Sequence, residues 1–187
     1  MSEHVILVAG PMGAGKTTAI RAVSETPVVS TEAVNTDRAT SDKDTTTVAL
    51  DYGEIRIDDE ERIRLYGLPG QRRFEFMWRI LVDRAIGMIL LLDNSRPDPL
   101  ADLAEYLEAF DGFLQRGSLV VGVTRHDHAG TPQLGEHIAV VAQRLPGRSV
   151  PVLPLDPRDS AETRLALMSL IATIEMEAML STTRSTP

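Results

Sequence analysis

The chain has 187 residues, 27 acidic against 19 basic side chains, and a formal net charge of -8 at pH 7. This length is typical of one domain and allows a core that folds without covalent staples. The acidic balance argues against binding to nucleic acid or to an anionic membrane surface, because both need a basic face. The absence of cysteine excludes disulfides and thiolate metal sites.

We expect a single-domain, cytoplasmic protein. Residues 1–3 lead directly into an apolar segment, which leaves no room for the basic and apolar regions of a signal peptide. The longest apolar runs, such as 86–92, are much shorter than the ~20 residues that span a membrane. The composition predicts one domain over residues 1–180 and a flexible tail over 181–187.

Apolar segments of strand length alternate along the chain with segments of helical period. Strands are expected at 4–9, 47–57, 62–66, 86–92, 118–124 and 150–155. Helices are expected at 16–24, 73–84, 99–115, 133–144 and 159–180. This alternation is typical of the α/β class. It predicts a three-layer α/β/α fold with a mostly parallel, six-stranded sheet and one antiparallel edge strand.

Three of these segments have features that affect the expected packing. Residues 47–57 and 62–66 are expected to form a hairpin, whereas 30–46 is rich in Ser, Thr and Asp and is expected to be a mobile loop. In the last helix, eight apolar residues recur at roughly helical period and are expected to face the core. These residues are Leu165, Leu167, Met168, Leu170, Ile171, Ile174, Met176 and Met179.

A phosphate-loop motif follows the first strand directly. The octapeptide Gly10-Pro11-Met12-Gly13-Ala14-Gly15-Lys16-Thr17 matches G-x-x-x-x-G-K-[ST] at every fixed position. Glycines let the backbone curl so that successive N–H groups point at a phosphate chain, and the following helix adds free N–H groups and a positive dipole end. A strand, this loop and a helix in that order predict a nucleoside triphosphate site.

Individual residues of this loop have distinct expected roles. The Lys16 ammonium is expected to reach the β- and γ-phosphates, and the Thr17 hydroxyl is expected to ligate Mg²⁺. The residues expected to contact the nucleotide here are Gly10, Met12, Gly13, Ala14, Gly15, Lys16, Thr17 and Thr18.

Further landmarks follow the phosphate loop in a set order. They are a threonine run at 45–47, Tyr66-Gly67-Leu68-Pro69-Gly70-Gln71, Thr124-Arg125-His126-Asp127, and the short loop Asp156-Pro157-Arg158. In this order they resemble a Ras-like P-loop small GTPase over nearly the whole chain. The resemblance is closest to the bacterial conservon-type and gliding-motility-type small GTPases, which have similar Thr-Thr-Thr-Val-Ala and Gly-x-Pro-Gly-Gln segments.

The resemblance implies a nucleotide-dependent switch. Thr47 matches the family's threonine that ligates Mg²⁺ and contacts the γ-phosphate, although Thr45 and Thr46 are close rivals. Gly70 matches the glycine whose N–H contacts the γ-phosphate, and Gln71 matches the glutamine that orients the attacking water. The implied metal ligands are Thr17 and Thr47, and the implied catalytic residues are Gln71, Lys16 and Thr47. Candidates for a charge-stabilising arginine are Arg38, Arg72 and Arg73.

The segment that would recognise the base departs from the family pattern. The family has Asn-Lys-x-Asp, in which the Asp carboxylate accepts two hydrogens of guanine, whereas this chain has Thr124, Arg125 and Asp127. The resemblance implies that Asp127 selects guanine and that the Arg125 stem lies over the base. It also implies that loss of the Asn loosens a tie to the phosphate loop. In the final loop, backbone N–H groups are expected to reach guanine O6; Pro157 has none, so Asp159 or Arg158 is expected to supply one.

One glycine and two aspartates bear on how a metal is held. Ras-like chains usually have Asp at the position of Gly67, so its absence predicts loose Mg²⁺ binding and slow intrinsic hydrolysis. Asp93, at the end of a predicted strand, is interpreted as structural rather than metal-binding. Asp51 lies inside the strand expected at 47–57 and is a poor metal candidate.

We therefore expect a guanine-nucleotide switch that binds GTP with Mg²⁺ and hydrolyses it slowly to GDP and phosphate. The resemblance implies a roadblock-type regulatory partner. Two alternatives stay open, namely a nucleotide-binding scaffold with little or no hydrolysis and a P-loop kinase that uses ATP. The kinase would need an Arg-rich lid, for which the pairs Arg72-Arg73 and Arg144/Arg148 are insufficient.

The role implied for Gln71 leads to a first prediction. Gln71→Leu removes the amide that would orient water, so GTP turnover is expected to fall while GTP binding stays unchanged. Single-turnover hydrolysis and equilibrium binding, measured on the same preparation, check this. An unchanged single-turnover rate would remove Gln71 from the catalytic set.

Overall fold

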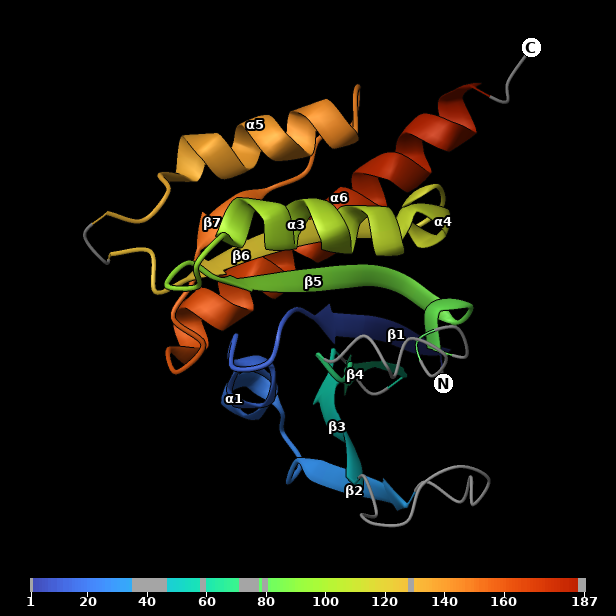
Figure 1. Ribbon diagram of the computed structural model, residues 1–187. Helices are drawn as coiled ribbons and strands as arrows, with labels where there is room; N and C mark the ends of the chain where they lie inside the picture. Colours follow the sequence, from blue (N-terminus) through green and yellow to red (C-terminus); the bar gives the residue numbers. More distant parts are fainter. Residues whose placement is uncertain are drawn as a thin grey trace, which may run out of the picture.

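The computed structural model describes residues 2–34, 47–57, 60–70, 78, 81–127 and 130–184 (Figure 1). The first half of the chain forms β1 (Ser2–Ala9), α1 (Lys16–Val23), β2 (Val29–Val34), β3 (Thr47–Arg56), β4 (Glu61–Gly67) and β5 (Ala85–Asp93). The second half forms α3 (Pro99–Ala109), α4 (Asp111–Leu114), β6 (Ser118–Thr124), α5 (Leu134–Arg144), β7 (Val152–Pro154) and α6 (Ser160–Arg184).

A seven-stranded sheet forms the middle layer, in the order β2-β3-β4-β1-β5-β6-β7. Among the described strands, β3 alone runs antiparallel to its two neighbours, and the other pairs are parallel. Helices α3 and α5 lie together on one face of the sheet, while α1 and α6 lie together on the other (Figure 1). The predicted three-layer α/β fold, mostly parallel with one antiparallel strand, is confirmed.

The sheet differs from the prediction at one edge. The sequence predicts a mobile loop over 30–46, but Val29–Val34 forms β2 and pairs with β3, which gives seven strands rather than six. The antiparallel strand β3 therefore lies one place inside the edge. The Ser, Thr and Glu of this segment resemble a loop in composition, whereas its β-branched residues suit a strand. The rest of the expected loop, 35–46, lies outside the described residues.

The bounds of three helices differ from the predicted ones. The helix expected over 99–115 is divided into α3 and α4, with Phe110 between them. Of the helix expected over 73–84, the described residues 78, 81 and 82 are helical. Helix α6 continues to Arg184, beyond the boundary that we placed at 180.

Alternation of side chains along β1 divides the core between the two faces of the sheet. Leu7 and Ala9 join the cluster beneath α3 and α5, whereas Ile6 and Val8 join the cluster beneath α1 and α6. Strands β5 and β6 are almost completely buried, as is typical of parallel strands covered on both faces. This packing fixes the carboxyl ends of β1, β5 and β6 along one edge of the sheet.

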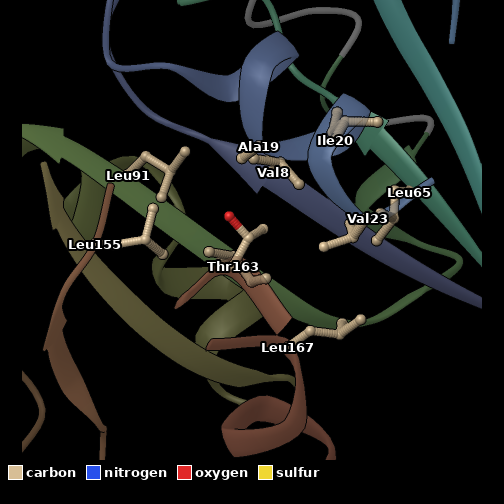
Figure 2. Close-up of a pocket in the computed structure, with 10 residues that line it drawn as sticks. Val8, Ala19, Ile20, Val23, Leu65, Leu91, Leu155, Thr163 and Leu167 are labelled. Atoms are coloured by element: carbon tan, nitrogen blue, oxygen red, sulfur yellow. The ribbon is translucent and has the colours of Figure 1, made fainter. Parts of the chain in front are cut away.

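A small cavity lies in the second of these clusters, between α1, the sheet and α6 (Figure 2). Side chains such as Val8, Leu91 and Leu155 line it, and its polar group is the Thr163 hydroxyl, which donates to the Asp159 carbonyl oxygen at 2.9 Å. Its volume of about 10 Å³ is at the lower limit for one water molecule. It is therefore a packing gap and not a ligand site.

The apolar residues of α6 do not all face the core, which corrects our expectation. Leu167 and Leu170 are buried against the sheet. Because apolar residues lie on both sides of this helix, their spacing alone does not identify the buried side. The expected core residues that are exposed instead are Leu165, Met168, Met176 and Met179.

Helix length and hydropathy also bear on membrane insertion. In the part of the chain that the structure describes, none of the helices combines the length and the apolar content needed to cross a bilayer.

Two residues of α6 provide a matched test of this packing. Leu170 is 0% exposed, so Leu170→Ala is expected to lower the free energy of unfolding by about 2–5 kcal/mol. Met168 is 66% exposed, so Met168→Ala is expected to change it by less than about 0.5 kcal/mol. Denaturant unfolding measures both values. Equal losses would contradict the placement of α6.

Candidate functional site

Three glycines shape the loop between β1 and α1. Gly10, Gly13 and Gly15 have φ angles of +134°, +86° and +97°, which residues with a Cβ rarely adopt. At Gly10 a Cβ would also lie 2.0 Å from the carbonyl oxygen of Leu91 on β5. The loop therefore requires glycine here both for its turns and for its fit against the sheet.

The Lys16 ammonium lies against the main chain of this loop. Its Nζ donates to the carbonyl oxygens of Gly10 and Pro11, each at 2.8 Å. Burial lowers the pKa of Lys16 to about 8, while the negative charge of Asp51 acts in the opposite direction. A cation held inside a curled backbone is suited to a phosphate chain.

Helix α1 begins directly after the loop, with Gly15 at its N-terminal cap and no acidic residue in its first turn. Its own side chains therefore do not neutralise the positive end of its dipole. In this first turn the Thr17 hydroxyl donates a hydrogen bond to the carboxylate of Asp51 on β3. Asp51, which we judged a poor candidate from its place inside a strand, lies at the site instead.

The oxygen atoms near α1 suit a magnesium ion. Thr17 is the donor in its bond to Asp51, so the lone pairs of its hydroxyl oxygen stay available to a cation. Within the described residues, no group of three or more His, Asp or Glu side chains is placed to hold a metal by itself. Thr47, the other predicted ligand, begins β3, and its side chain is outside the described part.

The segment after β4 packs against the phosphate loop. A Cβ at Gly70 would lie 2.6 Å from the Met12 nitrogen and 2.8 Å from the Gly10 oxygen. Glycine therefore allows the two backbones to approach this closely. Gln71, the predicted catalytic residue, follows immediately but lies outside the described residues, as do Arg38, Arg72 and Arg73.

An aromatic cluster holds this segment from the side of α3. Trp78 Nε1 donates to the Pro69 carbonyl oxygen at 3.2 Å, and the Tyr106 hydroxyl donates to the Gly70 carbonyl oxygen at 3.4 Å. The Trp78 ring stacks on Phe110 and on Tyr106, with centroid separations of 4.8 Å and 6.0 Å. One hydrogen bond from α3 and one from Trp78 thus hold the backbone that touches the phosphate loop.

A pocket of about 580 Å³ opens beside the phosphate loop, past the carboxyl end of β6. Ligands of open α/β sheets bind at this edge, and the volume suits a small molecule. The pocket joins three segments that are far apart in the sequence, and the sequence analysis singled out all three. Its lining residues are Gly13, Ala14, Gly15, Thr18, Thr124, Arg125, His126, Asp127, Leu155, Asp156, Pro157, Arg158 and Glu162.

Arg125 ties the pocket to the phosphate loop. Its φ is +51°, its guanidinium forms an ion pair with Asp93 at the end of β5, and it donates to the Gly13 carbonyl oxygen at 3.4 Å. Thr124 is turned into the sheet, where its hydroxyl donates to the Leu92 carbonyl oxygen at 3.1 Å. We expected that Thr124, in place of the family's Asn, would loosen the link between this loop and the phosphate loop. Arg125 forms that link instead.

Asp93 is committed to protein partners. Burial raises its pKa, but hydrogen bonds from Ser95 and Arg125 outweigh burial and hold the pKa below its ordinary value. The Ser95 hydroxyl donates to the carboxylate at 2.6 Å, and the Ser95 N–H donates at 3.0 Å. This supports the structural interpretation of Asp93.

The loop after β7 closes the far side of the pocket. A Cβ at Gly15 would lie 2.5 Å from Pro157 Cγ, so the proline ring packs directly on the phosphate loop. Arg158 pairs with Asp156 at 2.6 Å and lowers the pKa of Asp156 to about 2. The N–H groups of Arg158 and Asp159 both donate to Asp156, each at 2.9 Å. The N–H groups that we expected at guanine O6 are therefore used within the loop.

Sequence reasoning located most of the pocket and missed two acidic residues. Asp127 lies exposed in the pocket lining, where the resemblance placed it. The missed residues are Asp51 and Glu162, and Glu162 accepts the Asp156 N–H at 2.6 Å. The sequence did contain a signal for Asp51. A charged residue that is buried in a strand needs a polar partner, and the neighbouring strand has no carboxylate of its own at Gly67.

Three comparisons relate the chain to known proteins. A family model described as "conserved hypothetical ATP binding protein" matches residues 26–131, which is more than half of the chain and begins after the phosphate loop. An uncharacterized protein of Methanocaldococcus jannaschii is 40% identical over 50 residues, 27% of this chain and 32% of that protein. Intraflagellar transport protein 22 of Chlamydomonas reinhardtii is 26% identical over 113 residues, 59% of this chain and 55% of that protein.

The chain thus spans about a third and about half of the lengths of these two relatives. Among solved structures, the Arl6 BBS3 small GTPase of Trypanosoma brucei, with the bound nucleotide analogue GppNp, is similar with a TM-score of 0.66. The match has 15% identity and covers 94% of this chain and 99% of that chain. At this identity the likeness shows the fold, which is that of a small GTPase.

The contact between Gly15 and Pro157 can be tested with matched variants. Gly13→Ala and Gly15→Ala both place a Cβ at positive φ, at a cost of about 1–2 kcal/mol each. A Cβ at Gly13 would meet nothing within 4 Å, whereas one at Gly15 would lie 2.5 Å from the Pro157 ring. We expect Gly15→Ala to lower the thermal unfolding midpoint further than Gly13→Ala.

A double variant isolates the contact. Combining Pro157→Ala with Gly15→Ala should recover the extra loss, because the ring that meets the new Cβ is removed. If the losses simply add, the two loops do not pack as described.

Proposed function

Since the chain belongs to the family described as conserved hypothetical ATP-binding proteins, we propose that it is a nucleotide-binding switch, and that its nucleotide is GTP or GDP held with Mg²⁺. We further propose that it hydrolyses GTP slowly to GDP and phosphate. The chain has the fold of a small GTPase, with a phosphate loop in front of α1.

One observation supports the proposal most. The phosphate loop, which holds the Lys16 ammonium, opens directly into a pocket of about 580 Å³ that contains Asp127 and the loop 155–158. A nucleotide needs this pair of features, namely main-chain N–H groups and a cation for its phosphates and an adjoining pocket for its base. The pocket continues from the loop without a break, since Gly13, Ala14 and Gly15 line both.

The choice of base depends on Asp127. A carboxylate accepts the N1–H and the exocyclic amine of guanine, and adenine offers no matching pair of donors. Because the N–H groups of Arg158 and Asp159 are occupied, guanine O6 has no donor from these two residues. The family's description favours ATP as the second candidate. Selectivity for guanine therefore depends on one carboxylate and is expected to be smaller than a full set of contacts would give.

The residues around the phosphates have complementary roles in the proposed site. Lys16 and the N–H groups at the start of α1 would bind the phosphate chain, and the Thr17 hydroxyl and Thr47 would hold Mg²⁺. The ion, when bound, would neutralise charge on the phosphate oxygens. Gln71 would orient the attacking water. Gly70 would then contact the terminal phosphate through its N–H.

The proposed switch is the segment that begins at Leu68. Its Gly70 backbone packs on Met12 and Gly10, where a terminal phosphate held by Lys16 would lie close by. Binding and loss of that phosphate would therefore favour different positions of this segment. A roadblock-type protein that reads or accelerates this change is the partner that the resemblance suggests.

A single substitution tests the base assignment. Asp127→Asn replaces an acceptor with an amide, so GDP and GTP affinity is expected to fall about ten- to a hundredfold. The Asn amide can donate to the C2 oxygen of xanthine while its oxygen accepts N1–H, so xanthosine diphosphate should bind the variant better than the parent. Calorimetric titrations with guanosine, xanthosine and adenosine nucleotides measure these affinities.

Controls separate this result from general damage. Asp83 is exposed and lies away from the pocket, so Asp83→Asn should leave all affinities unchanged. If adenosine triphosphate binds the parent well while guanosine nucleotides do not, the ATP assignment replaces the GTP assignment.

A further inference from the structure

The register between β3 and β4 brings an aspartate to a position where the neighbouring strand has none. Asp51 of β3 pairs directly with Gly67, the last residue of β4. Gly67 in turn pairs with Val8, close to the point where β1 enters the phosphate loop. At this place on the sheet edge, β4 therefore has a glycine and β3 has a carboxylate opposite it.

The Asp51 side chain occupies the space that a side chain at position 67 would need. A Cβ at Gly67 would lie 3.0 Å from Asp51 Cβ and 3.2 Å from Asp51 Oδ2. The Ile20 Cδ1 atom of α1, also at 3.0 Å, closes the other side. The glycine at 67 thus makes room for the Asp51 side chain. The carboxylate at this place comes from β3 and not from β4.

The carboxylate of Asp51 is directed at the start of α1. The residue is only 7% exposed, and a carboxylate at this depth is costly unless it is hydrogen-bonded. It accepts a hydrogen bond from the Thr17 hydroxyl, and its charge acts on the Lys16 ammonium. The two residues that it influences are those expected to hold the metal and the phosphates.

We propose that Asp51 is the positioning carboxylate of the metal site, and that it replaces the aspartate absent at position 67. By accepting the hydrogen bond of the Thr17 hydroxyl it turns the lone pairs of that oxygen toward the cation, and it adds negative charge beside the cation. This is the usual function of a residue that binds a metal ligand rather than the metal. The inference rests on the proposed function, because the ion binds with the nucleotide.

Asp93, the other acidic residue considered for the metal, does not suit this role. Its carboxylate accepts hydrogen bonds from the Ser95 hydroxyl, the Ser95 N–H and the Arg125 guanidinium. Of these two aspartates, Asp51 is the one that contacts Thr17. Accordingly, we expect Mg²⁺ to bind more tightly than the absence of an aspartate at position 67 alone implies.

The experiment measures how Mg²⁺ slows release of a fluorescent GDP from the purified full chain. Asp51→Asn keeps the size of the side chain but removes its charge. The Mg²⁺ concentration that gives half of the maximal slowing is expected to rise about 10–100-fold in this variant. Release in excess chelator should match the parent, because the phosphate loop is unchanged. Glu54→Gln, on the same strand but paired with Arg62, is the matched control and should behave as the parent.

A carboxylate exchange tests the replacement itself. Asp51→Ala removes the side chain that would meet a new Cβ at 67, and Gly67→Asp in the same chain supplies a carboxylate from β4. The double variant should return the half-effective Mg²⁺ concentration to within about tenfold of the parent. A nucleotide-loaded double variant that stays as insensitive to Mg²⁺ as Asp51→Asn would overturn the replacement.

The outcomes distinguish the two proposals. If Asp51→Asn and the parent respond to the same Mg²⁺ concentrations, the role of Asp51 is overturned and nucleotide binding stands. If the parent retains neither GDP nor GTP at any Mg²⁺ concentration, the proposed function fails and the role of Asp51 fails with it.

Discussion

The hydrogen bonds between Lys16 and its own loop are the interaction on which the site depends. The ammonium draws the carbonyl oxygens of Gly10 and Pro11 together, and glycines at positive φ allow the backbone to follow. The other walls of the site pack on this curled main chain, with Gly70 on one side and Pro157 on the other. A loop folded around a cation leaves that cation ready to exchange carbonyl oxygens for phosphate oxygens.

Two contacts at the site are made from unexpected positions. Arg125 links the pocket beyond β6 to Gly13 and to Asp93, from the position next to Thr124. Asp51 approaches Thr17 from β3, although the corresponding residue of β4 is a glycine. Asp51 reaches this point because neighbouring strands bring different side chains to the same place on the sheet, whereas Arg125 directly follows position 124 in the chain.

The sequence alone was sufficient for the fold class and for most residues of the pocket, because both depend on local patterns. The phosphate loop is contiguous, and the apolar runs of β5 and β6 are unambiguous. The register between strands could not be predicted from such local patterns. Asp51 pairs with Gly67, but the number of residues between the two strands does not determine which residues pair. The exposed side of α6 was missed for a similar reason, since methionines on both sides of a helix leave its orientation to tertiary packing.

The chain contains a single tryptophan, and its indole ring is placed where the backbone meets the phosphate loop. Trp78 lies in the stack with Phe110 and Tyr106 and donates to the residue just before Gly70. Any separation of Gly70 from Met12 must alter the polarity and packing around that indole. The emission of the unmodified protein therefore offers an intrinsic optical readout of this contact.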